Sequence, residues 1–103
     1  MLPEPSDPRG RLDLEAVRVV GRLTALGPRR APHTILAEAC ADLAVLSWAA
    51  ELRDGRPPRI DVAPHGWADV VRVLIGDLLA VRPEPDQLAP AATRLTRLRR
   101  ELP

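Results

Sequence analysis

Apolar residues recur at intervals of three and four positions along four stretches of the chain, which is the spacing of one face of an α-helix. In three of these stretches, charged residues occupy the opposite face. The second stretch differs because it carries no charge between Asp42 and Glu51, so we expect it to be a central helix or one shared with a partner chain. The pattern predicts four helices, over about residues 13–26, 32–54, 65–81 and 87–102.

Proline and glycine mark the ends of these stretches. The twelve prolines gather between them, near residues 3–8, 28–32, 57–64 and 83–90 and at the last position. Because proline lacks an N–H donor and clashes with the preceding turn, we expect none inside a helix beyond its first turn. Gly27 and Gly55 are expected stops, and Asp13 and Asp86 are expected N-caps. The predicted fold class is all-α, a small antiparallel four-helix bundle in which short loops join neighbouring helices.

The length of 103 residues suits one domain with one hydrophobic core. Residues 1–10 contain three prolines and a glycine without apolar periodicity, so we expect a disordered N-terminal tail followed by a single helical domain over 11–103. The apolar residues are mostly Ala, Leu and Val, with two Trp and no Phe or Tyr. This composition favours close-packed helices over a sheet.

All fifteen basic residues are arginine, which together with the many Ala, Pro and Val indicates a GC-rich bacterial origin. The net charge of +1 gives no overall attraction to nucleic acid. Cys40 is the single cysteine and cannot form an internal disulfide. The N-terminus lacks a signal region, and no apolar run is long enough to span a bilayer. We therefore expect a cytoplasmic protein with no membrane partner.

Residues that would support catalysis are missing from the pattern. Without lysine or tyrosine, the chain cannot form a Schiff base or use a phenol as a general acid. The two histidines, His33 and His65, fall in separate segments. On the second helix, no pair among His33, Glu38, Cys40 and Asp42 has the i, i+4 spacing with His or Cys that is typical of metal ligands. We expect no enzyme activity, no metal and no cofactor.

Two features indicate surfaces for a protein partner. Gly21 and Gly76 lie inside the first and third helices, away from the main apolar stripes, where each costs about 1 kcal/mol relative to alanine. Small residues there would let another helix approach closely, although neutral drift also explains them. The second helix has surplus apolar residues near its end that could line a groove or belong to the core: Leu46, Trp48, Ala49 and Leu52.

The last helix carries a cluster of arginines. Arg94, Arg97 and Arg100 fall on its outer face, where they could contact phosphate groups. The alternative is that they complement the helix C-terminus and keep the surface soluble. No aromatic residue accompanies them to stack on bases.

These features predict a non-catalytic helical protein–protein interaction module, with a homodimer as one form of it. The alternative is a small nucleic-acid-binding regulator that uses the arginine-rich last helix. Self-association in solution tests the first hypothesis, and binding of nucleic acid at low salt tests the second.

Overall fold

The four apolar stretches form α-helices in a computed structural model, which describes residues 7–27, 29–51 and 66–103. The helices are α1 (Pro8–Leu26), α2 (His33–Ala50), α3 (Trp67–Ala80) and α4 (Pro85–Glu101). No strand occurs in the described ranges. The all-α class predicted from the spacing of apolar residues is therefore confirmed.

The first helix begins earlier than predicted. The Asp7 carboxylate accepts a hydrogen bond from the Gly10 N–H at 2.8 Å, and Pro8 follows at the first helical position, where a missing N–H costs nothing. Asp13, the predicted N-cap, therefore lies inside α1. The predicted tail overlaps the helix at residues 8–10, and residues 1–6 lie outside the described part of the chain. At the other end Gly27, with φ of 74°, ends α1 as predicted.

The second helix ends at Ala50, earlier than predicted, and the expected stop at Gly55 falls outside the described residues. The fourth helix begins at Pro85, one residue before Asp86, the predicted cap, because Glu84 takes that role and its N–H donates to Gln87 Oε1 at 2.9 Å. Pro90 lies inside α4 beyond the first turn, contrary to expectation. Pro90 and Asp86 are both exposed, so water can reach the Asp86 carbonyl that lacks its helical donor.

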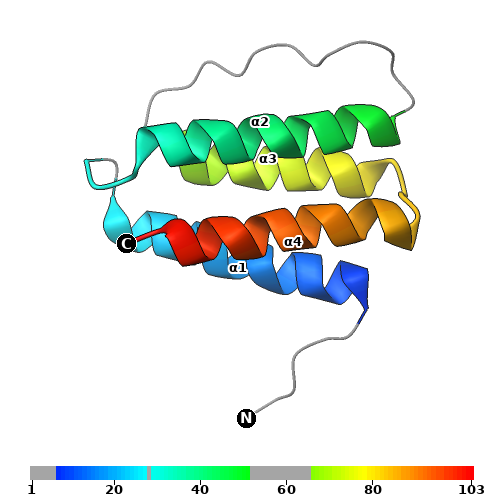
Figure 1. The fold of residues 1–103 in the computed structure, drawn as a ribbon, viewed down its shortest axis with the longest axis horizontal. Helices are drawn as coiled ribbons and strands as arrows, with labels where there is room; N and C mark the ends of the chain where they lie inside the picture. The colour runs from blue at the N-terminus through cyan, green and yellow to red at the C-terminus, as the bar shows by residue number, and fades with distance from the viewer. Residues whose placement is uncertain (1–6, 28, 52–65) are drawn as a thin grey trace.

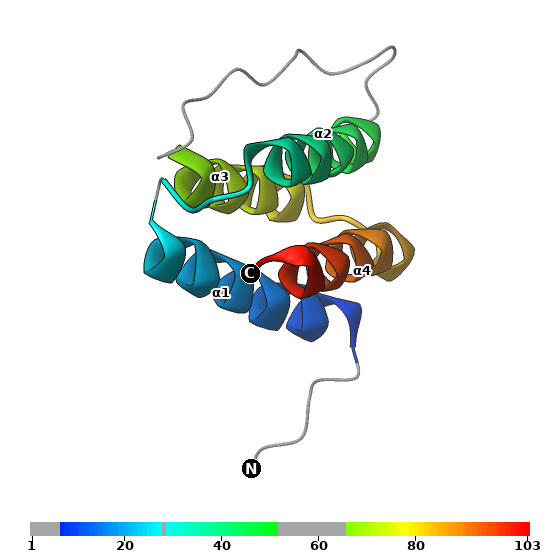
Figure 2. The ribbon, with the colours of Figure 1, turned by 60° about the vertical axis from the view of Figure 1, so that its left-hand side comes forward.

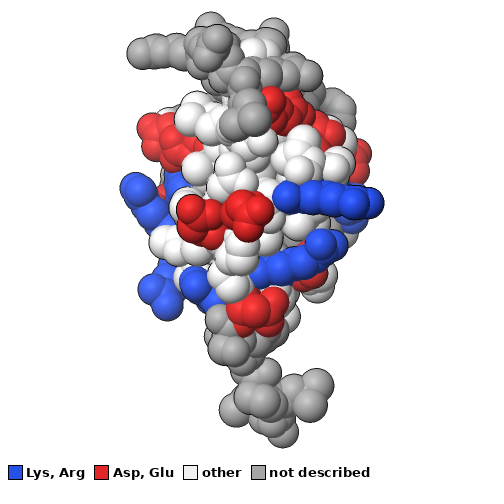
Figure 3. Space-filling model, turned by 90° about the vertical axis from the view of Figure 1, so that its right-hand side faces the viewer, with Lys and Arg blue, Asp and Glu red and all other residues white. Residues whose placement is uncertain are grey.

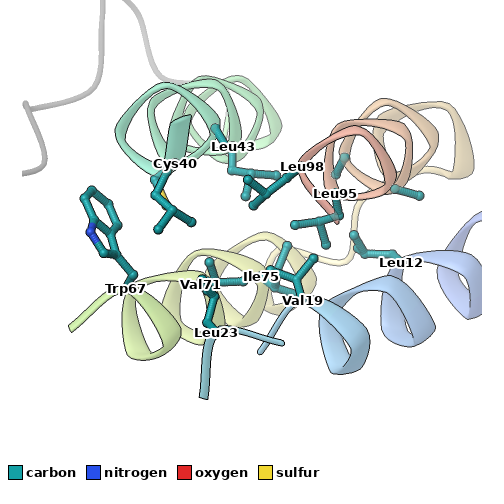
Figure 4. Close-up of a cluster of buried hydrophobic side chains, with 14 of the residues drawn as sticks. Leu12, Val19, Leu23, Cys40, Leu43, Trp67, Val71, Ile75, Leu95 and Leu98 are labelled. Atoms are coloured by element: carbon teal, nitrogen blue, oxygen red, sulfur yellow. The ribbon is translucent and has the colours of Figure 1, made fainter. Parts of the chain in front are cut away.

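Each helix packs against two others, so that the four close into a ring around one core (Figure 4). The neighbouring pairs are α1/α4, α4/α2, α2/α3 and α3/α1. Helices joined by short connections, α1 with α2 and α3 with α4, lie diagonally across this ring. The prediction that short loops join neighbouring helices is wrong on this point. The Cα radius of gyration of 13.2 Å is close to the value of about 13 Å expected for a compact chain of this length.

Helices α1 and α4 run in one direction, and α2 and α3 run in the other (Figures 1 and 2). A ring contact agrees with this course, because His33 at the start of α2 meets Trp67 at the start of α3 with centroids 5.2 Å apart. The pairs α1/α4 and α2/α3 are therefore parallel. The antiparallel arrangement predicted for all neighbours does not hold for these two pairs.

The core is almost entirely aliphatic, and all four helices contribute to it (Figure 4). Trp67 lies at one edge of it, and no other aromatic residue is buried in the described chain. The largest side chains with almost no exposure are Leu12, Val19, Leu36, Cys40, Leu43, Val71, Leu78, Leu95 and Leu98. Truncation of such a leucine to alanine typically costs about 2–5 kcal/mol, so this set holds the ring of helices together.

Candidate functional site

A groove between α1 and α4 gathers arginine side chains from both helices. It has a volume of about 430 Å³. One residue of α1 and five of α4 line it: Arg11, Thr93, Thr96, Arg97, Arg100 and Glu101. We call it the α1/α4 groove.

Helical spacing and the parallel course of α1 and α4 assemble the α1/α4 groove. Thr93, Arg97 and Arg100 follow one another at intervals of four and three, so they share one side of α4. Arg11 joins them because the start of α1 lies beside the later turns of α4. The sequence analysis found Arg97 and Arg100 but missed Arg11, because no spacing rule connects residues of separate helices whose relative direction is unknown.

The α1/α4 groove has an excess of positive charge, since three arginines face one glutamate. Arg97 Nε donates to Glu101 Oε1 at 2.9 Å. The guanidinium groups of Arg11 and Arg100 have no hydrogen bond or ion pair within the described residues. A guanidinium stays protonated and has only donors, so the three arginines can hold an anion.

Arg94 does not lie on the outer face of the last helix, as the sequence analysis expected. Its side chain is only 11% exposed, and its Nε donates to Asp42 Oδ2 on α2 at 2.6 Å. Its Nη1 is buried without a partner in the described chain. The physical reason is that α4 packs against α2 on one side and α1 on the other, so its outer face is narrower than the sequence suggested. Arg94 therefore joins two helices and is not available to a phosphate.

Glu15 of α1 is a charged residue that is nevertheless buried. It is 6% exposed and accepts hydrogen bonds from Arg99 of α4 at 2.7 and 3.2 Å and from Arg18 at 3.1 Å. Burial raises the pKa of this carboxyl, but the hydrogen bonds and charges of Arg99 and Arg18 outweigh burial and hold the pKa below its ordinary value. The spacing of Glu15 from Leu12 and Val19 was a signal of its inward position.

The residues predicted to bind a partner occupy different environments. On α2, Leu46 packs against the core, Trp48 is half-buried and Ala49 is exposed, while Leu52 lies outside the described residues. Of the described members, only Ala49 is exposed. Gly21 and Gly76 are exposed, and a Cβ placed on either would meet no atom within 4 Å.

Three valines are exposed, one each on α1, α2 and α3. Val17 is 71% exposed, Val73 is 59% exposed and Val45 is 52% exposed. Val17 precedes Gly21 by one turn of α1, and Val73 precedes Gly76 by nearly one turn of α3. The glycines and two of the valines thus make small, apolar patches on two helices that pack against each other.

Other chemistry finds little support in the described residues. They contain no group of three His, Cys, Asp or Glu side chains that could hold a metal, and none of their helices has the length and apolarity to cross a membrane. Cys40 is fully buried; burial raises the pKa of its thiol to about 12, against a smaller opposing effect of the Arg94 charge. On the face shown in Figure 3, basic and acidic side chains are interspersed.

Comparison of the chain with protein-family models, with curated proteins and with solved structures gives no match.

Proposed function

We propose that this chain is a non-catalytic helical interaction module that self-associates through the outer sides of α1 and α3. The surface consists of Val17, Gly21, Val73 and Gly76, and we call it the α1/α3 face. The observation that carries the proposal is the exposure of Val17 and Val73, at 71% and 59%, beside two glycines. Burying one valine contributes about 1.5–3 kcal/mol, so covering both in each of two copies would be strongly favourable.

The glycines make close approach to the α1/α3 face possible. Nothing lies within 4 Å of a Cβ placed on Gly21 or Gly76, so the backbone of each helix is open to another chain. A glycine inside a helix lowers helix stability by about 1 kcal/mol relative to alanine. Two such positions on packed neighbours, each about a turn from an exposed valine, support a contact surface there.

A second copy of the chain suits the charge of this face. Close to Val73, Arg72 Nη1 donates to Asp69 Oδ1 at 2.8 Å, so these two charges already compensate each other. An arginine that is already paired in this way does not attract an acidic partner to the face. A twofold dimer would bring the face against itself and bury the same residues in both copies.

The fold that we propose for this module is a four-helix bundle, with two parallel and two antiparallel contacts between neighbours. The ring of packed helices around one aliphatic core supports it. The nucleic-acid alternative has less support, because Arg94 pairs with Asp42 and Arg97 with Glu101, which leaves fewer cations for a phosphate backbone.

Sedimentation velocity over a range of protein concentrations tests the proposal. The native chain should sediment as a dimer, and the variants Val17→Glu and Val73→Glu should sediment as monomers with unchanged helical circular dichroism. Val45→Glu is the matched control, because Val45 is exposed to a similar extent on α2, away from the α1/α3 face. It should leave the dimer intact.

Two results would contradict the proposal. A native chain that stays monomeric at high micromolar concentration would remove self-association. If Val45→Glu dissociated the dimer and Val17→Glu did not, the contact surface would lie on α2, where a partner groove was predicted from the sequence.

A further inference from the structure

We propose that the α1/α4 groove binds the phosphate group of a small phosphomonoester. This inference is independent of the proposed self-association, because Arg11, Arg97 and Arg100 take no part in the α1/α3 face. Arginine is suited to the task because its planar guanidinium can donate two parallel hydrogen bonds to phosphate oxygens.

The positive charges of the groove are only partly compensated. Glu101 is the single acid lining it and pairs with Arg97 at 2.9 Å. Arg11 and Arg100 have no partner within the described residues, whereas Arg94 and Arg99, which also lie between helices, are each held by a carboxylate. A dianionic phosphate group between them would relieve the repulsion of two like charges.

Arg11 lies where a helix disfavours a cation. It lies in the first turn of α1, where the helix dipole places partial positive charge, and the Asp7 carboxylate at the N-cap is already engaged with the Gly10 N–H. Arg100 is in a favourable position, because cations in the last turn of α4 complement the helix dipole. The parallel course of α1 and α4 therefore brings an unfavourable cation beside a favourable one, and a bound anion would stabilise both.

The size and composition of the groove also suit a small anionic ligand. A volume of about 430 Å³ lies within the range of roughly 300–1,000 Å³ typical of small-ligand sites. Thr93 is exposed and its hydroxyl can donate to a phosphate oxygen, whereas the Thr96 hydroxyl donates to the Ala92 carbonyl at 3.0 Å. No aromatic residue lines the groove to stack on successive bases, which favours a compact ester over a single-stranded nucleic acid.

The test is an NMR titration of the full chain with adenosine monophosphate, observing the Nε–Hε signals of the arginines. At neutral pH its phosphate carries about −1.5 to −2 charges. The signals of Arg11 and Arg100 should shift and saturate with a millimolar or lower Kd, and adenosine should cause no shift. Inorganic phosphate should bind if the phosphate group alone is recognised, and weaker binding than the ester would show that the organic part contributes.

The variants Arg11→Gln and Arg100→Gln should each weaken binding by about tenfold or more while sedimentation stays unchanged. Arg11→Lys keeps the charge but loses the paired donors, so it should bind less tightly than the native chain. Arg72→Gln on α3 is the matched control and should bind like the native chain, because it removes one exposed arginine outside the groove.

Three outcomes would overturn the proposal: no saturable shift up to about 10 mM ester, equal weakening by Arg72→Gln and Arg100→Gln, or an oligonucleotide that binds far more tightly than the ester at moderate salt. The last outcome would assign the groove to nucleic acid. Since self-association is measured without any phosphate compound, failure here leaves the result on the α1/α3 face unaffected.

Discussion

Arg99 on α4 holds Glu15 on α1 through two hydrogen bonds, Nε to Oε2 at 2.7 Å and Nη2 to Oε1 at 3.2 Å. The two residues belong to the first and last helices, and Arg18 contacts the same carboxylate at 3.1 Å. Glu15 is thus a buried charge whose partners come from both helices. This contact fixes the relative position of α1 and α4 and, with it, the shape of the α1/α4 groove.

The variant Glu15→Gln should lower the free energy of unfolding by about 2 kcal/mol, because a hydrogen bond to a charged group contributes about 1.5–3 kcal/mol and glutamine keeps the shape without the charge. Urea unfolding followed by circular dichroism measures this difference. Asp69→Asn is the control, since its ion pair with Arg72 is exposed and should contribute less than about 1 kcal/mol. Equal losses for both variants would mean that burial of Glu15 has no energetic importance.

The same carboxylate should make stability depend on acidic pH. Its pKa in the folded chain lies below the ordinary value of 4.5, so the unfolded chain binds more protons as the pH falls. Its contribution to stability is fully present above the unfolded pKa and is lost as the pH falls through the folded pKa. Unfolding measured at a series of pH values should therefore show a steeper acid loss for the native chain than for Glu15→Gln. Parallel curves would contradict this assignment.

Cys40 should resist thiol reagents in the native state. Its thiol is fully buried and has a pKa raised to about 12, so at pH 8 almost no thiolate is present or accessible. We expect labelling by a disulfide reagent to be at least about a hundredfold slower than in denaturant, where the pKa returns to about 8.5. Rapid native labelling would show that α2 separates from the ring far more often than its buried contacts allow.

Replacing Arg94 with methionine should change the free energy of unfolding by less than about 1.5 kcal/mol, in contrast to Glu15→Gln. Arg94 carries a buried nitrogen without a partner in the described chain, and methionine removes that unfavourable group while filling similar space. Asp42 is 56% exposed, so it can be solvated by water when its partner is lost. Thermal unfolding measures this change. A loss of more than about 3 kcal/mol in the free energy of unfolding would show that the Arg94–Asp42 pair is essential for stability.

The variants Gly21→Ala and Gly76→Ala should each stabilise the monomeric chain by about 0.5–1 kcal/mol. Alanine restricts the unfolded chain, and its Cβ meets no atom within 4 Å in the folded chain. They should also weaken self-association, since the added methyl keeps a second helix away. Thermal unfolding at low concentration and sedimentation separate the two effects. Gly27→Ala, at φ of 74°, is the contrasting control and should destabilise the chain. Stabilisation without weaker association would support neutral drift at these glycines.

The helices could be predicted from the sequence because their signals are local. Intervals of three and four residues located all four helices, and Gly27 gave the end of α1. The errors were also local: Asp7 with Pro8 competes with Asp13 as a start, and Pro90 is tolerated inside α4 because its neighbourhood is exposed. The order of the helices in space was not predictable in this way. A connection of the length of 52–65 permits either direction for α3, and no local pattern decides between them.

Prediction of the candidate sites requires the relative direction of the helices, which the sequence does not show. Arg97 and Arg100 were found from their spacing within α4, but Arg11 joins them only because α1 and α4 run parallel. Arg94 was misplaced for a related reason, since the position of α2 beside α4 turns it inward to Asp42. Gly21 and Gly76 were found as breaks in a helical pattern, whereas the exposure of Val17 and Val73 depends on how the helices pack.

The diagonal placement of consecutive helices has a consequence for cooperativity. A unit made of α1 and α2, or of α3 and α4, leaves its apolar stripes open, because each helix packs mainly against members of the other unit. Neither half can therefore persist alone as a folded fragment, and the molecule should gain and lose its structure in a single step. Splitting the chain between α2 and α3 should give two pieces that become helical only when they are mixed.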